Sequence, residues 1–370
     1  MNKILKRAYE ATLGKLSGKL AAGILLNATP SYYRETPKVG FAEILEAYEK
    51  DPSCKAFVDF LADQAVGMGF YTTANSEYVY AEEAKRVVDE FNENVNMDSL
   101  LQQAAREVVA CGNSFWLKID RERLRDLVIL PLTEIKGIKR FKIEPVGVEH
   151  GVEYYVYGVQ QKRLNPKYVI HFRWNPVNNS PFGTGILQVL LQTLTISGEK
   201  RMSFLEMKAR IERVLPEIFE KYAGPDELWI FPDVTPEKLN EFRALIRSKP
   251  KSGARFVYDK PNADIKTVRV DPRARFEAYM EHILNQVYLG GQTPLPKLFT
   301  TPGFTEASAR AALEIAERKI MALQRFIARV VEREIFRLIV AQEGLNPNEA
   351  GVRLRWGQPS TQTIKVSDML

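Results

Sequence analysis

Hydrophobic positions recur with a helical period from Thr305 to Glu343, a stretch that contains neither glycine nor proline. The pattern predicts one helix over 306–343, with Thr305 as its N-cap and a length of roughly 55 Å. We expect a helix longer than one modest core requires to span a layered or multi-subunit object. The apolar face consists of Leu313, Ala316, Ile320, Leu323, Ile327, Val330 and Leu338.

A shorter helix is predicted upstream, from Arg273 to Tyr288, with Gly290-Gly291 ending it. Three prolines and a glycine then fall within 292–305, which rules out regular structure between the two helices. The apolar face of the shorter helix is Phe276, Met280, Ile283, Leu284 and Val287.

The first half of the chain predicts an α+β module of about 150 residues. Residues 27–40 resemble a linker, and helices are expected over 41–66, 82–92 and 97–110. The pattern then changes to strands, over 114–119, 127–132, 138–145, 153–159 and 168–174. In the last strand, alternation predicts one buried face, formed by Tyr168, Ile170, Phe172 and Trp174.

A small insert is predicted between two helices. A helix over 186–213, weakened by Gly198, leads to 214–271, which has the pattern of a βαββ unit. Its elements are strands over 218–222, 227–231, 255–258 and 265–270 and a helix that begins at Thr235-Pro236. A strand over 352–356 precedes a polar tail, and residues 2–19 form a basic amphipathic helix.

Composition indicates a protein without a disulfide framework. The 370 residues are 45% hydrophobic, which is ample for a core, and the net charge of +6 permits a polyanionic partner. Cys54 and Cys111 lack metal-ligand spacing, which favours a reducing compartment. We expect no signal peptide and no membrane span, and therefore an intracellular protein.

Charge on the long helix is the strongest local signal. Arg325, Arg329, Arg333 and Arg337 recur every four residues, and like charges at this spacing destabilise an isolated helix. This arginine ridge therefore requires an anionic partner. Two partners remain open: acids of the same or a neighbouring subunit, with Glu332 and Glu334 as candidates, or nucleic acid.

Motifs for catalysis are weak. The phosphate-loop pattern of ATP-hydrolysing enzymes is absent, and Gly183-Thr-Gly185 fits a loop-to-helix turn better than a phosphate cradle. The three histidines, His150, His171 and His282, have no second ligand at metal spacing.

A metal-dependent nuclease is the enzymatic alternative. Pro232-Asp233 and Glu317-Arg-Lys319 supply its two sequence halves, but the second falls within the predicted long helix instead of on a strand. We therefore expect no catalytic residue, no metal and no cofactor.

The order of these elements resembles the portal proteins of tailed bacteriophages and archaeal viruses, in particular the HK97-type portal family. The resemblance covers most of residues 40–357, and the order of parts is more specific than any one motif. The similar stretches are Ala110-Cys-Gly-Asn-Ser-Phe-Trp-Leu117, Val169-Ile-His-Phe-Arg173, Ser180-Pro-Phe-Gly-Thr-Gly185, Phe276–Pro296 with its Tyr288-Leu-Gly-Gly-Gln-Thr-Pro294 segment, and Leu354-Arg-Trp-Gly357.

The resemblance implies a portal-like α+β fold with eight parts. These are an N-terminal arm (1–40), a wing (41–180), a stem helix (181–213), a clip (214–271), a second stem helix (272–291), a channel loop (292–305), a long helix at the base of the wing or crown (306–343), and a C-terminal strand and tail (344–370). The tail after Pro359 departs from the family pattern, because it is too short for a large helical crown.

The resemblance also implies a function. It is a non-enzymatic ring, usually of twelve subunits, at one capsid vertex of the virion, assembled in the host cytoplasm. Double-stranded DNA would pass through it during packaging and ejection. The implied partners are the terminase large subunit, the major capsid protein and a head-tail adaptor, with no membrane.

Candidate contact residues follow from this assignment. In the channel loop, Gln292, Thr293, Lys297, Thr300 and Thr301 would face DNA with weak, sequence-independent contacts. On the clip, Arg247, Lys249, Lys251 and Arg255 would contact the motor or adaptor. Besides the nuclease, a structural scaffold that binds no DNA remains an alternative.

Overall fold

The computed structural model is α+β, as the sequence predicts. It has two compact units, Met1–Val189 with Gly291–Leu370, and Leu190–Gly290, which are taken separately below. The residues described are 30–120, 123–143, 148–193, 195–196, 199–223, 227–230, 235–247, 255–258, 281–283, 285–287, 289–291 and 306–358.

The first two helices of the larger unit are α3 (Phe41–Lys50) and α4 (Pro52–Val66). The prediction of one helix over 41–66 is therefore wrong at Asp51. The Asp51 carboxylate accepts hydrogen bonds from the backbone N–H groups of Ser53, at 2.9 Å, and Cys54, at 3.0 Å. Pro52 occupies the first turn, where its missing N–H costs nothing, so a new helix begins here.

Helices α5 (Ala81–Asn94) and α6 (Met97–Cys111) confirm the predicted second and third helices. Gly112 ends α6 in the left-handed region, with φ of 75°. This conformation is easily adopted only by glycine, so the chain can turn directly from α6 into the next strand.

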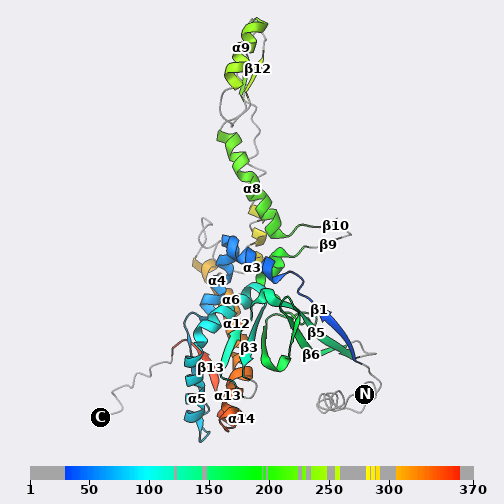
Figure 1. Cartoon of the computed structure of the whole chain (residues 1–370). Helices are drawn as coiled ribbons and strands as arrows, with labels where there is room; N and C mark the ends of the chain where they lie inside the picture. The colour runs from blue at the N-terminus through cyan, green and yellow to red at the C-terminus, as the bar shows by residue number, and fades with distance from the viewer. Residues whose placement is uncertain are drawn as a thin grey trace, which may run out of the picture. The chain divides into compact units, whose positions relative to one another are not determined.

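A four-stranded antiparallel sheet contains β1 (Pro30–Glu35), β5 (Ile135–Ile143), β6 (Val148–Tyr157) and β7 (Lys162–Leu164), in that order (Figure 1). The assignment of all of 27–40 to a linker is wrong for residues 30–35. Tyr32 of β1 pairs with Phe141 of β5, and their rings lie 6.4 Å apart. Because the partner strand is about 100 residues away, local pattern alone could not reveal this strand.

A three-stranded sheet has the order β4-β3-β8, from β3 (Asn113–Ile119), β4 (Asp126–Ile129) and β8 (Val169–Arg173). Ile170, Phe172 and Trp174 are buried as predicted, whereas Tyr168 is only half-buried. The opposite face is also covered, because His171 stacks on Phe115 with ring centroids 4.2 Å apart. The prediction of one buried face is therefore wrong: this sheet is covered on both sides. Short 3₁₀ turns, Leu132–Glu134 and Pro166–Tyr168, precede β5 and β8.

The end of the chain returns to this unit. Helix α12 (Glu306–Val331) continues through a π turn, η3 (Glu332–Phe336), into α13 (Arg337–Gln342), followed by α14 (Pro347–Ala350). Strand β13 (Arg353–Trp356) then pairs with β2 (Phe70–Thr73) in an antiparallel ribbon. The predicted helix over 306–343 and strand over 352–356 are both present. Thr305 lies outside the described residues.

In the smaller unit the predicted helix over 186–213 is interrupted. Helix α7 (Ile186–Leu191), at the unit boundary, is followed by a hairpin of β9 (Thr195–Ile196) and β10 (Glu199–Lys200). Helix α8 (Phe204–Ala223) starts after Ser203, whose hydroxyl accepts from the Glu206 N–H at 3.1 Å. The strand predicted over 218–222 is also wrong, since α8 continues through Pro216 to Ala223.

The insert within this unit contains a parallel β-α-β crossover. Strands β11 (Glu227–Ile230) and β12 (Arg255–Tyr258) pair in parallel, and α9 (Pro236–Arg247) lies between them in sequence. The described residues of 281–291 are helical, so Gly290-Gly291 do not end the helix before residue 291. The predicted strand over 265–270 and the amphipathic helix over 2–19 lie outside the described residues.

Candidate intersubunit and DNA-facing surface

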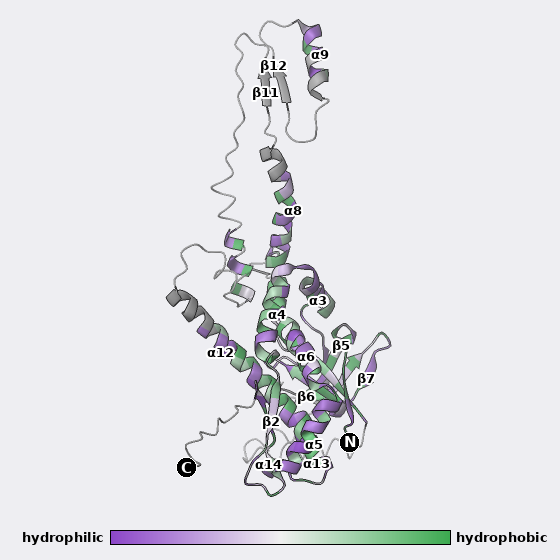
Figure 2. Ribbon diagram, turned by 90° about the vertical axis from the view of Figure 1, so that its left-hand side faces the viewer, coloured by the Kyte–Doolittle hydropathy of each residue, from purple (hydrophilic) through white to green (hydrophobic). Residues whose placement is uncertain are grey.

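The arginine ridge lies on the exposed side of α12, η3 and α13. Arg325, Arg329, Arg333 and Arg337 are all exposed, while Leu323, Ile327 and Val330 of the predicted apolar face are buried. Hydrophobic and hydrophilic residues alternate along α12, as expected for a helix with one buried and one exposed side (Figure 2). The four arginines therefore lie away from the core, on the side of the helix opposite the buried apolar residues.

The π turn shifts the buried face of the helix. After Val331 the buried residues are Ile335, Phe336, Ile339 and Val340, whereas the predicted Leu338 is only half-buried. A π turn closes with i→i+5 hydrogen bonds and so contains more residues per turn than an α-helix. The inserted position moves the core contacts one residue along the sequence, from Leu338 to Ile339.

The same turn affects the arginine ridge. In an α-helix four residues rotate by about 400°, so side chains spaced by four drift roughly 40° per step around the helix. The wider π turn reduces the rotation between Arg333 and Arg337. It therefore limits the drift of the last arginine away from the line of the others.

The two acids expected to neutralise the ridge are largely committed to other groups. Glu332 accepts from Arg353, at 2.9 Å, and from the Leu354 N–H, at 3.0 Å, which attaches the π turn to β13. Glu334 is shared between Arg333, at 2.9 Å, and Lys118, at 3.3 Å. Neutralisation by Glu332 is therefore not observed, and Glu334 neutralises only Arg333.

The remaining arginines divide into two kinds. Arg337 donates to the side-chain oxygen of Asn348 on α14. Arg325 and Arg329 make no ion pair or hydrogen bond with any residue of the described ranges. Two adjacent exposed guanidinium groups thus have no ion-pair or hydrogen-bond partner among the residues that the structure describes.

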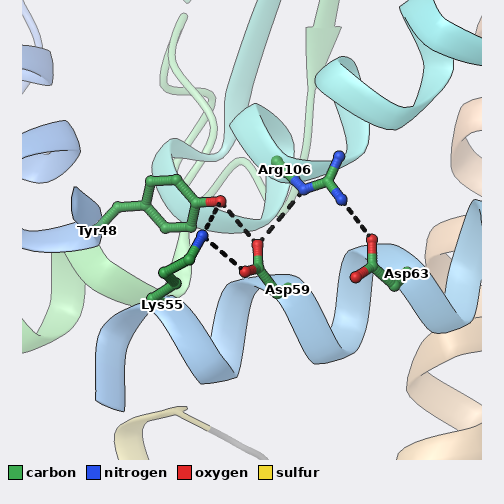
Figure 3. Close-up of polar contacts among 5 residues, drawn as sticks. All are labelled: Tyr48, Lys55, Asp59, Asp63 and Arg106. Carbon is green, nitrogen blue, oxygen red and sulfur yellow. Dashed lines mark hydrogen bonds and ion pairs between the residues drawn. The ribbon is translucent and has the colours of Figure 1, made fainter. Parts of the chain in front are cut away.

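A polar cluster that the sequence did not reveal joins α3, α4 and α6 (Figure 3). The Tyr48 hydroxyl donates to Asp59 at 2.7 Å, and Lys55 lies 2.9 Å from the other Asp59 oxygen. Arg106 of α6 contacts Asp59 at 3.4 Å and Asp63 at 2.6 Å. Burial raises the pKa of Asp59, but the hydrogen bonds from Tyr48 and Lys55 outweigh it, so the net pKa is lowered. The cluster therefore links three helices of the larger unit.

Comparison with known proteins rests on structure, since no family model and no curated protein matches the sequence. A chain in the neck of the empty gene transfer agent (GTA) particle, computed with C6 symmetry, has a TM-score of 0.59 at 14% identity, covering 96% of this chain and 92% of that one. A chain in the virion of the native GTA particle has a TM-score of 0.57 at 12% identity, covering 91% and 88%. An HK97 family phage portal protein from Corynebacterium diphtheriae has a TM-score of 0.46 at 11% identity, covering 87% and 95%.

The chain shares the fold of these two chains of GTA particles. The structural similarity extends over most of the chain, in agreement with the resemblance drawn from the order of the sequence elements.

Within this fold, Gly183-Thr-Gly185 is a packing junction and does not cradle a phosphate. The Gly183 N–H donates to the Asn113 side-chain oxygen at 2.8 Å, and the Thr184 N–H donates to the Trp174 carbonyl at 2.8 Å. A Cβ on Gly185 would overlap the carbonyl of Ala110. The glycines are therefore explained by close backbone approach, and two of the amides are already used.

Asn113 is the centre of this junction and was not singled out from the sequence. Its amide nitrogen donates to the carbonyls of Cys111, at 2.8 Å, and Gly183, at 3.3 Å. Its oxygen also lies 3.0 Å from Nε2 of His171. Burial, with a smaller contribution from Arg173, lowers the pKa of His171 to about 3, so this histidine is neutral and structural.

The nuclease hypothesis gains no support from the described residues. Glu317 and Lys319 lie in helix α12, as predicted, and not on a strand beside a second acid. No group of three metal-binding side chains occurs within the described ranges. Pro232-Asp233 lies outside them.

The other candidate contact residues are only partly described. Arg247 ends α9 and Arg255 begins β12, while Lys249 and Lys251 lie outside the described residues. The channel-loop candidates, Gln292, Thr293, Lys297, Thr300 and Thr301, also lie outside them. Among the helices that are described, none has the length and apolar character needed to cross a bilayer.

Proposed function

We propose that this chain is the subunit of a ring at one capsid vertex, through which double-stranded DNA enters and leaves the particle. The fold supports this role, because the structural neighbours with TM-scores above 0.5 come from the neck and the virion of GTA particles. The observation that carries the proposal within this chain is the exposed arginine ridge, whose Arg325 and Arg329 have no acid among the described residues.

The exposed arginines require a partner for a physical reason. Four like charges on one face of a helix destabilise it by a few tenths of a kcal/mol per pair. A ring supplies two anionic surfaces that a monomer lacks, the acids of a neighbouring subunit and the phosphates of DNA. Both fit the ridge, and the experiment below separates them.

The finer assignments belong to the same proposal. Residues 41–180 form the wing, 181–213 and 272–291 the stem, 214–271 the clip and 292–305 the channel loop. Twelve subunits assemble in the host cytoplasm and contact the major capsid protein. The clip, through Arg247, Lys249, Lys251 and Arg255, meets the terminase large subunit during packaging and a head-tail adaptor afterwards. The loop residues Gln292, Thr293, Lys297, Thr300 and Thr301 slide along the DNA backbone.

The test compares assembly with DNA packaging. The wild-type chain should give rings with a central hole in negative stain and a mass of several hundred kilodaltons. Arg325→Ala/Arg329→Ala should abolish ring assembly if the ridge faces a neighbouring subunit. Intact rings that fail to package DNA would assign the ridge to DNA instead.

The control is Arg86→Ala, which removes an exposed arginine of α5 that is paired with Glu90 at 3.8 Å. It should leave rings and packaging unchanged. A wild-type chain that remains a monomer or dimer at all concentrations would refute the proposed function. Metal-dependent DNA cleavage by the purified chain would favour the nuclease.

A further inference from the structure

A pocket of about 360 Å³ lies between β2 and the C-terminal end of α5. Phe70 and Tyr71 of β2 line one side, and Asn92 and Glu93 of α5 line the other, with Asp98 of α6 nearby. The residues come from three elements of the same unit, so the pocket is formed by the fold and not by one loop.

The first observation that points to a ligand is Asn92. This side chain is only 7% exposed, and neither its amide oxygen nor its amide nitrogen has a hydrogen-bond partner among the described residues. Leaving a buried amide unpaired is costly, and most native proteins avoid it. Since Asn92 lines the pocket, an entering donor group would satisfy its side-chain oxygen.

The second observation is the charge around Asn92. Glu93 is exposed and lies in the last turn of α5, where the helix dipole is negative and an acid is unfavourable. The last turn of α5 contains no basic residue. Asp98 also makes no ion pair within the described part of the chain, although its place in the first turn of α6 favours a negative charge.

The one lysine at the pocket is already occupied. Lys85 pairs with Asp89 at 2.6 Å, and Asp89 also accepts a hydrogen bond from Thr72. The acids left for a ligand are therefore Glu93 and Asp98. Together with the Asn92 oxygen they form a site for a cation.

The chemistry favours an organic cation over a metal ion. The described residues contain no group of three side chains that could ligate a metal. A guanidinium group is planar and carries five N–H donors, so it can bond Asn92 and the two carboxylates together. Its flat face also stacks well on aromatic rings, and the pocket lining includes Phe70 and Tyr71.

We propose that this pocket receives an arginine of the ridge, Arg325 or Arg329, from a second copy of the chain. This contact rests on the proposed function, because a ring places copies of the chain side by side. Within the described part of the chain, Arg325 and Arg329 are exposed and pair with no acid, and Glu93 and Asp98 of the pocket pair with no base. When different patches of identical subunits contact each other, the contact repeats from subunit to subunit and can close into a ring.

The test is photo-crosslinking in the full-length chain. A benzoylphenylalanine at position 94, which is exposed and next to Glu93, should crosslink to residues 318–337 of another copy. Mixing isotopically light and heavy copies identifies crosslinks between subunits. The same probe at position 86, two turns earlier on α5, is the control and should give no such product.

A charge reversal supplies the second measurement. Glu93→Lys should raise the concentration at which rings dissociate by at least about tenfold, because it places a like charge opposite the incoming arginine. Glu90→Lys, one turn earlier and outside the pocket lining, should change it less than twofold.

The outcomes separate this inference from the proposed function. Rings that form without the crosslink, or that respond equally to the two lysine variants, overturn the pocket assignment and leave the ring intact. Crosslinks within one copy or to residues 359–370 also overturn it. A wild-type chain that never forms rings refutes the proposed function, and this inference with it.

Discussion

Replacing Asn113 by Ala tests whether one buried amide holds the junction between α6, β3 and the 174–185 segment. Asn113 is 1% exposed, and its side chain makes contacts at 2.8, 2.8, 3.0 and 3.3 Å. The Gly183 N–H fixes the orientation of the amide, because only the oxygen can accept from it. The bond to His171 then requires the hydrogen on Nε2.

The expected cost follows from these contacts. Each of the three shorter hydrogen bonds is worth about 1 kcal/mol, and the groups left buried without partners add about 1–2 kcal/mol. Asn113→Ala should therefore lower the free energy of unfolding by about 4–5 kcal/mol. Asn94→Ala, an exposed asparagine near the end of α5, should change it by less than about 0.5 kcal/mol.

The measurement is urea unfolding followed by tryptophan fluorescence at one fixed protein concentration, since assembly itself stabilises the folded chain. Amide exchange at Gly183 provides a local readout, because its N–H loses its acceptor in the variant. A loss below about 1 kcal/mol with unchanged exchange at Gly183 would show that the junction does not depend on Asn113.

Three further predictions concern groups whose surroundings are well defined. Burial lowers the pKa of Lys319 to about 8, and its ammonium lies 5.6 Å from the Trp174 ring. The folded chain favours the neutral amine, so stability is lost as the pH falls from about 10.5 through 8. Lys319→Met should therefore raise the free energy of unfolding at pH 7 by about 1–2 kcal/mol in urea unfolding, a value reduced to allow for the partial exposure of the lysine. An unchanged free energy of unfolding would contradict this prediction. Burial raises the pKa of Glu107, and this outweighs the hydrogen bonds from Ser114 and Gln103, which lower it. The stability that comes from the protonated form of Glu107 is therefore lost as the pH rises through the elevated pKa. Glu107→Gln should flatten the pH dependence of the unfolding midpoint above pH 5, and an unchanged profile would count against the assignment. Asp51→Ala removes the cap of α4 and should cost about 1 kcal/mol by thermal unfolding, with Asp51→Asn losing at most half as much; equal losses would show that capping is not the cause.

The parts of the fold that could be predicted from the sequence are those determined by the spacing of hydrophobic residues within one element. Helix α12 and its exposed arginines follow from the spacing of apolar residues over many turns, so they could be placed in advance. The π turn could not, because one extra residue in a turn changes the period only locally. Strand β1 was missed because its evidence lies in β5, far along the sequence.

Two buried asparagines show how the signals for polar sites differ. Asn92 follows Ala81, Ala84 and Val88 at helical spacing, so it could have been recognised from the sequence as a polar residue in an apolar stripe, although we did not predict it. The importance of Asn113 depends on Gly183, 70 residues later, which only the tertiary structure brings close. The channel loop and most of the clip candidates remain predictions.

The pairing of β2 with β13 has a consequence for synthesis of the chain. Strand β13 emerges from the ribosome roughly 280 residues after β2. At about 5–20 residues per second, β2 therefore waits about 15–60 seconds for its partner. During this interval its hydrogen-bonding groups can pair with other chains, which makes β2 a target for chaperones and a starting point for aggregation on crowded polysomes. Because the smaller unit is encoded between the two strands, it can fold first, while the larger unit is still incomplete.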